Sequence, residues 1–173
     1  MNQYVLLLRG INVGGHNKLP MKDLREILAA LRYESVKTYI QSGNVVLSAR
    51  SAPDESAIIA AIDKRFGFSP RILVIPGEQF EAVAEANPYK DEDLDGKFLH
   101  VWYLAGPASP DMDGIETRKG PNERFTLSED AFYLRAPDGI ARSKLANDVE
   151  KLLGVEGTGR NLNTVRKLME MLA

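Results

Sequence analysis

The sequence predicts an α+β fold in which the same order of elements occurs twice. Three observations lead to this prediction. The chain begins with an uninterrupted apolar run at residues 5–8, alternating strand-like segments come in pairs, and helical spacing of apolar residues separates the strands. The chain of 173 residues is 44% hydrophobic and 27% charged, which suits a globular protein made of two small, packed halves.

The first half is expected to start with a buried strand. Residues 5–8 are all apolar, which is typical of a central strand covered on both faces. A helix should follow Pro20, because apolar residues recur from Met21 to Leu31 at helical spacing. Residues 36–41 alternate like a strand, and residues 45–47 supply its hairpin partner after a turn.

A second helix and a fourth strand complete this half. Pro53 opens the helix and Gly67 ends it, and the strand at residues 72–75 stops at Pro76-Gly77. The resulting order of strand, helix, strand, strand, helix, strand is the split βαβ arrangement of a ferredoxin-like unit. We therefore assign residues 1–76 to a first ferredoxin-like (βαββαβ) half.

Residues 77–173 are predicted to repeat this order after a linking helix that ends at Asn87-Pro88. The expected elements are a strand over 98–104, a short helix or a loop over 107–114, hairpin strands over 124–127 and 132–135, a helix over 145–153 and a strand over 155–158. Asn163 is expected to cap a terminal helix. The predicted fold class is thus α+β, with two ferredoxin-like halves packed into one body.

Composition excludes several classes of function. The net charge of −2 gives no overall basic field, so nucleic acid could be contacted only through a local patch. The absence of cysteine excludes disulfides, thiol nucleophiles and thiolate metal sites. The two histidines, His16 and His100, lack metal-ligand spacing, so we expect no metal and no cofactor. Without a long apolar run or a signal-peptide pattern, a cytoplasmic protein with no membrane partner is expected.

The segment RGINVGGHNKLPM at residues 9–21 is the first candidate for a binding site. It leaves a strand, passes through glycines and enters a helix, which is how backbone N–H groups and a helix N-terminus come to surround an anion. The segment is not a P-loop, because His16 and Asn17 stand where lysine and a hydroxyl residue are required. The alternative is that Gly14 and Gly15 only permit a turn with positive φ.

Two further groups of polar residues could likewise belong either to a binding site or to local turns and helix caps. Ser42 and Asn44 would lie near the glycine segment if the first and third strands are neighbours, although they also suit a simple hairpin turn. Cations at a helix N-terminus are unfavourable, so Lys144 and Arg160 suggest an anion there, although their segments also read as helix caps. The candidate ligand-binding residues are Arg9, Asn12, Gly14, Gly15, Lys18, Ser42, Asn44, Lys144, Arg160 and Asn161.

Several of these segments also suggest a family. The motifs are LLRGINVGG at 7–15, KLPM at 18–21, TYIQSGNVV at 38–46, NP at 87–88, SKL at 143–145, RN at 160–161 and NTV at 163–165. Together they closely resemble the bacterial domain-of-unknown-function family labelled DUF 1697, over essentially the whole chain. The resemblance implies two ferredoxin-like halves packed as one body and implies no established activity. The chain departs from the family at Leu162, where an aromatic residue is expected, and at Tyr89, where phenylalanine is common.

Three hypotheses of function follow. The first is binding of a phosphate- or carboxylate-bearing ligand, with a nucleotide or short nucleic acid favoured because ferredoxin-like sheets can present aromatic residues such as Tyr39 for stacking. The second is an enzyme acting on a phosphorylated small molecule with His16 as acid or base. The third is a protein-interaction module with structural motifs only. For the first, we expect at least three of four cations to line one pocket with the glycine segment: Arg9, Lys18, Lys144 and Arg160.

Overall fold

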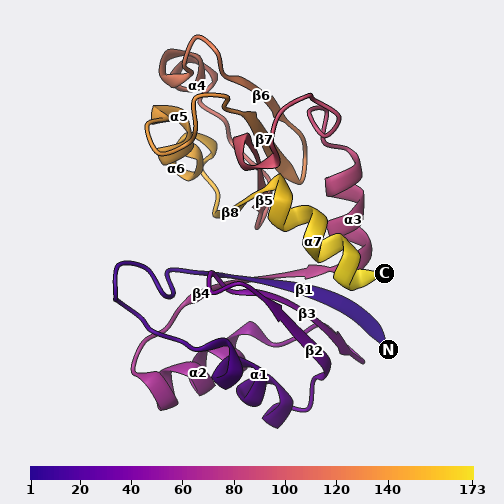
Figure 1. Ribbon diagram of the computed structural model, residues 1–173. Coiled ribbons are helices and arrows are strands. Elements are labelled where there is room, and N and C mark those ends of the chain that lie inside the picture. The colour runs from indigo at the N-terminus through magenta and orange to yellow at the C-terminus, as the bar shows by residue number, and fades with distance from the viewer. The chain divides into compact units, whose positions relative to one another are not determined.

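The computed structural model describes residues 1–173, which form two compact units. The first unit contains Met1–Glu81 together with Lys167–Ala173, and the second contains Ala82–Arg166. Each unit has its own four-stranded antiparallel sheet (Figure 1). The predicted α+β class with two ferredoxin-like halves is therefore confirmed. None of the helices has the length and apolar composition needed to cross a membrane.

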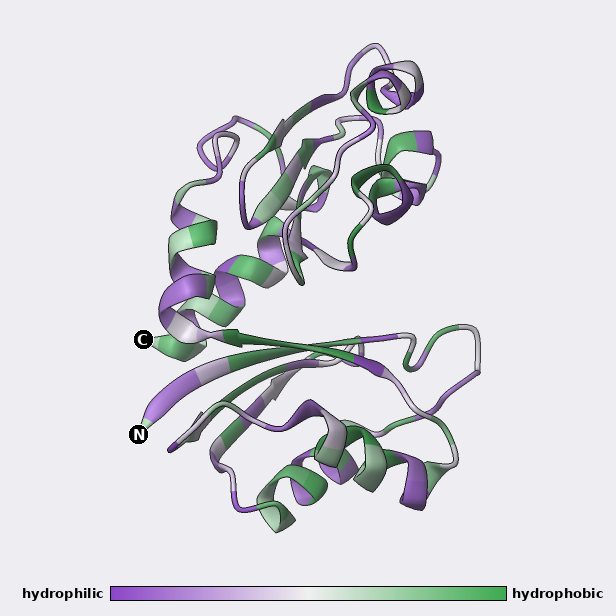
Figure 2. Cartoon of the chain, turned by 180° about the vertical axis from the view of Figure 1, so that it is seen from behind, coloured by the Kyte–Doolittle hydropathy of each residue, from purple (hydrophilic) through white to green (hydrophobic).

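The sheet of the first unit has the strand order β2-β3-β1-β4, which is the ferredoxin-like order. Its elements are β1 (Asn2–Arg9), α1 (Met21–Ala30), β2 (Glu34–Tyr39), β3 (Asn44–Ala49), α2 (Glu55–Phe66) and β4 (Arg71–Pro76). Both helices cover one face of the sheet (Figure 1). Side chains of β1 and β3 pack there against α1 and α2, and Figure 2 shows the strands as largely hydrophobic.

The central position of β1 agrees with the apolar run that predicted it. Residues 5–8 are all at most 1% exposed, and β1 pairs antiparallel with β3 on one side and β4 on the other. The helix boundaries also follow their predicted signals. The side chain of Asp54 accepts hydrogen bonds at the start of α2, and Gly67 ends it in the left-handed conformation with φ of 78°.

The second unit repeats the topology with the order β6-β7-β5-β8. The remaining elements are α3 (Gly77–Glu85), a 3-10 turn (Gly96–Phe98), β5 (Leu99–Leu104), α4 (Met112–Arg118), β6 (Arg124–Leu127), β7 (Ala131–Arg135), α5 (Lys144–Asn147), α6 (Val149–Leu153), β8 (Gly157–Asn161) and α7 (Leu162–Leu172). A second core forms where side chains of β5 and β7 meet those of α4, α5 and α6. For residues 107–114 we expected either a short helix or a loop. The structure has a helix, α4, which begins at Met112 and continues to Arg118.

Three local predictions about the last forty residues are wrong in detail. The helix expected over 145–153 is divided at Asp148 into α5 and α6. The last strand, expected over 155–158, lies at Gly157–Asn161, so it starts two residues later and ends three residues later than predicted. The terminal helix therefore begins one residue before Asn163. Its cap is Asn161, whose Oδ1 accepts a hydrogen bond of 3.0 Å from the backbone N–H of Thr164. Asn163 instead donates to Asp95 Oδ1.

Replacing Asn161 with alanine should destabilise the protein by about 1 kcal/mol, because one N–H at the start of α7 loses its acceptor. Asn163→Ala is the matched control, since it removes an exposed side-chain contact and leaves the cap intact. Urea unfolding followed by circular dichroism measures both changes. A larger loss of stability in Asn163→Ala than in Asn161→Ala would identify Asn163 as the cap and contradict this assignment.

Candidate functional site

The glycine segment after β1 folds into a small hairpin of its own. Val13 and His16 form an isolated antiparallel bridge, and the backbone N–H of His16 donates to the carbonyl of Val13 at 2.9 Å. The two residues between them, Gly14 and Gly15, have φ of 57° and 77°. Positive φ at both central residues defines a type I′ turn, which glycine adopts at little cost. The expectation that Gly14 and Gly15 permit a turn with positive φ is therefore confirmed.

Asn12 and Asn17 hold this hairpin in place. Asn12 Nδ2 donates to the carbonyls of Leu19 and Gln41, at 2.9 and 2.7 Å, while its Oδ1 accepts from the N–H of Leu19. Asn17 Nδ2 donates to the carbonyl of Gly10. The Asn12 amide thus uses both donors and one acceptor on the backbone, and it ties the glycine segment to the β2–β3 turn. In this geometry Asn12 positions the loop.

The β2–β3 turn lies against the end of β1, as expected for neighbouring strands. The N–H of Leu8 donates to the carbonyl of Gly43 at 2.8 Å. Asn44 is fully buried, and its Nδ2 donates to the carbonyl of Tyr39 and to Ser42 Oγ. Ser42 and Asn44 therefore lie at the same edge of the sheet as the glycine segment, and the Asn44 amide stabilises the turn.

The first candidate site is a pocket of about 330 Å³ at this edge of the first sheet. It is lined by Arg9, Gly10, Asn17, Ser69, Pro70 and Arg71. Arg9 at the end of β1 lies directly opposite Arg71 at the start of β4 in the antiparallel register. Residues opposite each other point to the same face of a sheet, so the two arginines are neighbours. Sequence analysis named Arg9 and missed Arg71.

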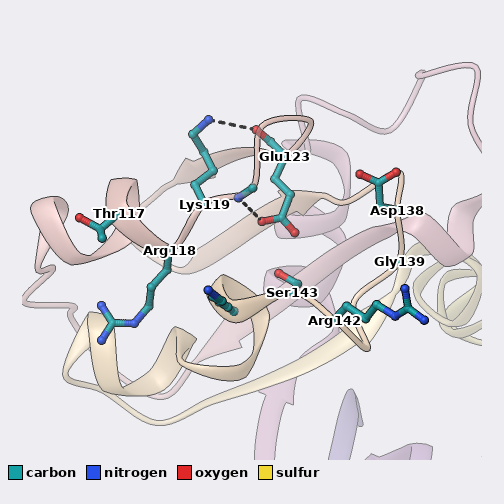
Figure 3. A pocket seen from close by; sticks show the side chains of 10 residues that line it. Thr117, Arg118, Lys119, Glu123, Asp138, Gly139, Arg142 and Ser143 are labelled. Atoms are coloured by element: carbon teal, nitrogen blue, oxygen red, sulfur yellow. Dashed lines mark hydrogen bonds between the residues drawn. The ribbon is translucent and has the colours of Figure 1, made fainter.

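The second candidate site is a cavity of about 630 Å³ within the second unit (Figure 3). Its walls come from the end of α4, the loop before β6, and the β7–α5 loop. The lining residues are Thr117, Arg118, Lys119, Gly120, Glu123, Asp138, Gly139, Arg142, Ser143 and Lys144. Four cations and two carboxylates face this cavity, so its lining has a net positive charge. Of the predicted site residues, Lys144 lies here.

Several polar groups of this cavity already hold the structure together. Arg118 Nε donates to Asp148 Oδ2 at 2.9 Å, and Figure 3 shows its guanidinium pointing away from Lys119. Glu123 is only 7% exposed, and its Oε1 accepts a 2.7 Å hydrogen bond from the N–H of Gly120. Lys119 Nζ donates to the carbonyl of Glu123. These contacts shape the tight turn that forms one wall.

The other predicted residues occupy different positions. Arg160 and Asn161 lie on β8, where Arg160 donates to the carbonyl of Gly159 and Asn161 caps α7. Lys18 and Arg160 line neither of the two pockets, whereas each pocket holds one of the four cations, Arg9 or Lys144. His16 is exposed at the hairpin turn. No group of three or more His, Asp or Glu side chains is arranged to hold a metal ion.

Sequence reasoning missed several residues that line these pockets, namely Arg71, Arg118, Lys119, Glu123 and Asp138. Arg71 follows a turn and begins a strand, which gave no chemical signal in the sequence. Lys119 precedes Gly120-Pro121, a pattern that predicts a turn and could have located one wall.

Comparison with protein families identifies the chain. The family model described as "Protein of unknown function (DUF1697)" matches residues 1–133, which is more than half of the chain. The chain belongs to this family. Among proteins with curated descriptions, none matches it.

Solved structures that match the chain include proteins from two organisms. One is described as a conserved bacterial protein from Streptococcus pneumoniae; it is 24% identical, with 99% of each chain covered and a TM-score of 0.73. This similarity supports the fold of the DUF1697 chain. The other is described as an unknown protein from Galdieria sulphuraria; it is 13% identical over 92% of this chain and 98% of that one, with a TM-score of 0.25.

Proposed function

We propose that this DUF1697 protein binds a phosphate- or carboxylate-bearing ligand in the pocket of Arg9 and Arg71. The observation that carries the proposal is the placement of these two arginines directly opposite each other on β1 and β4, with both lining one pocket. Arginine presents a planar fork of N–H donors that matches the oxygens of phosphate or carboxylate.

Electrostatics favours an anion at this position. Like charges on directly opposed residues of neighbouring strands are destabilising. An anion that contacts both guanidinium groups would offset this like-charge term and would accept charge-assisted hydrogen bonds from the two planar N–H forks.

The rest of the pocket suits a small ligand. Gly10 has φ of 74° and open space where a Cβ would stand, so its backbone is accessible from the pocket. Its carbonyl already accepts from Asn17, which holds the two sides of the loop together before any ligand arrives. Ser69 adds a hydroxyl group. A mononucleotide or the phosphate of a short oligonucleotide is the ligand class that we favour, with Arg9 and Arg71 on the phosphate.

Arg9→Ala should weaken binding of AMP and of inorganic phosphate at least about tenfold, because one charge-assisted hydrogen-bonding group is lost. Isothermal titration calorimetry on the full chain measures the change. Arg50→Ala is the matched control, since Arg50 is exposed and follows β3 at the opposite end of the sheet. It should leave binding unchanged.

The outcomes of this experiment separate binding from structure. If Arg9→Ala and Arg50→Ala weaken ligand binding equally, the effect comes from the overall charge of the protein, and the proposal is contradicted. Loss of the folded state in Arg9→Ala, seen by circular dichroism, would assign Arg9 a structural role. Tighter binding of AMP than of inorganic phosphate would support the nucleotide class.

A further inference from the structure

We infer that the cavity of the second unit is a separate binding site for a small ligand that carries a phosphate group together with an amine. The inference rests on the unequal use of charges in the cavity, where some lining groups are paired and others are not. It involves none of the residues of the Arg9 pocket, so it extends beyond the proposed function.

The cationic part of the site consists of Arg142 and Lys144. Both belong to the β7–α5 loop and its junction with α5, both are exposed, and the structure pairs neither with a carboxylate. Arg118, by contrast, is bound to Asp148, and Lys119 donates to the backbone of Glu123. Two of the four cations therefore stay available for a ligand, and they are two residues apart on one segment.

Ser143 fixes the backbone between these two cations. It lies between them, is 6% exposed, and its Oγ accepts a 3.0 Å hydrogen bond from the N–H of Ala146. Because this side chain is fixed inward, the backbone at residues 142–144 has little freedom to turn. The two cationic side chains therefore start from a fixed segment at the rim of the cavity.

The anionic part of the site consists of Glu123 and Asp138. Glu123 is buried, and one of its oxygens accepts from Gly120. Asp138 is exposed and accepts a 3.1 Å hydrogen bond from Asn122 Nδ2. Each carboxylate retains acceptor capacity, because an ionised carboxylate offers about four lone-pair sites. Glu123, Asp138 and Arg142 are among the side chains that line this cavity (Figure 3).

The presence of both signs in one cavity selects the ligand. A dianion without a cationic group would gain from Arg142 and Lys144 and lose by repulsion from the two carboxylates. An amine without a phosphate would be attracted by the two carboxylates and repelled by Arg142 and Lys144. A ligand with phosphate at one end and ammonium at the other satisfies both sets of groups, and a cavity of about 630 Å³ has the size of a small-molecule site.

The test compares O-phosphoethanolamine with ethyl phosphate, which has the same phosphate and lacks the amine. Calorimetry on the full chain should show phosphoethanolamine binding at least about tenfold tighter, as expected when an ammonium gains a buried carboxylate partner. Equal affinity for the two probes would overturn the assignment of Glu123 and Asp138. No saturable binding of either probe would overturn the site itself.

Variants assign the two ends of the ligand. The double variant Arg142→Gln, Lys144→Gln should weaken both probes at least about tenfold, whereas Lys151→Gln, an exposed charge on α6 outside the cavity, should change neither. Glu123→Gln and Asp138→Asn should reduce the preference for phosphoethanolamine and leave ethyl phosphate binding equal or tighter. Because Gln and Asn can still accept from Gly120 and Asn122, these variants should keep the fold.

Two outcomes with these variants would contradict the inference. Unchanged affinity in the double variant would place the phosphate elsewhere. An equal loss for both probes in Glu123→Gln would make Glu123 a structural residue only. Because the Arg9 pocket is itself proposed to bind phosphate, both probes and all variants are measured in the Arg9→Ala background, so that these outcomes report on the cavity of the second unit alone.

Discussion

Replacing Gly43 with alanine should destabilise the protein by about 3 kcal/mol or more. Gly43 has φ of 90°, and an added Cβ would lie 2.6 Å from Leu8 Cβ and 2.9 Å from Ile11 Cδ1. Leu8 and Ile11 are buried, so neither can move without disturbing the core of the first unit. Urea unfolding followed by circular dichroism measures the loss.

Gly15→Ala is the control for backbone conformation alone. Its φ of 77° is similarly positive, but nothing lies within 4 Å of the position that a Cβ would take. It should therefore cost only about 1 kcal/mol, the penalty of the left-handed region. Similar losses for the two variants would show that close packing against β1 contributes nothing. Gly43→Ala should also weaken binding at the Arg9 pocket, because the turn is joined to the glycine segment through Asn12 and Gln41.

Acidification should remove about 3 kcal/mol of stability between pH 6.5 and pH 4 through His100 alone. Burial lowers the pKa of His100 from its ordinary 6.5 to about 4, and a hydrogen bond to the backbone of Lys97 opposes this shift only in part. The side chain is 6% exposed, and its Nε2 has no hydrogen-bond partner. The unfolded chain therefore binds a proton below pH 6.5 that the native state excludes until about pH 4.

The sign of this effect is set by the direction of the shift. The contribution is fully present above pH 6.5 and decreases as the pH falls toward 4, because proton uptake favours the unfolded chain throughout that window. Urea unfolding of the wild type and of His100→Gln at pH 7, 5.5 and 4.5 measures it. The variant should show a correspondingly shallower decline. Parallel pH profiles for the two proteins would contradict the role of His100.

Asp95 titrates in a different window and does not obscure this result. Hydrogen bonds from the backbone of Lys97 and from Asn163 lower the pKa of Asp95 below its ordinary 3.8. Its contribution is present above pH 3.8 and is lost only as the pH falls below that value. The difference between the wild type and His100→Gln at pH 4.5 to 7 therefore separates the contribution of His100 from that of Asp95.

Local sequence patterns were sufficient to predict the order of elements in the first unit and most of that order in the second. The apolar run at residues 5–8 placed β1 at the centre of its sheet, and Pro20, Pro53 and Gly67 marked helix ends that the structure contains. These signals work because burial on two faces, a fixed φ and a left-handed cap depend on neighbours within a few residues. The turn at Gly14 and Gly15 was predictable for the same reason.

The same local signals misplaced the end of the second unit. Residues 157–161 contain two glycines and no apolar residue, so they carry little strand pattern, yet they pair with β5 along their whole length. Pairing with a buried strand supplies backbone hydrogen bonds that propensity does not reveal. Once β8 extends to Asn161, the following helix starts at Leu162, and Asn161 becomes the residue that can cap it.

The amino-acid sequence by itself determined the repeated βαββαβ order, the glycine turn after β1 and the family to which the chain belongs. Tertiary structure alone decided which charges meet. Arg9 and Arg71 are 62 positions apart and become neighbours only through the register of β1 and β4. Glu123 and Lys144 share a cavity only because α4, the loop before β6 and the β7–α5 loop converge. Electrostatic energy depends on distance in space, and strand register and loop packing set that distance between residues far apart in sequence.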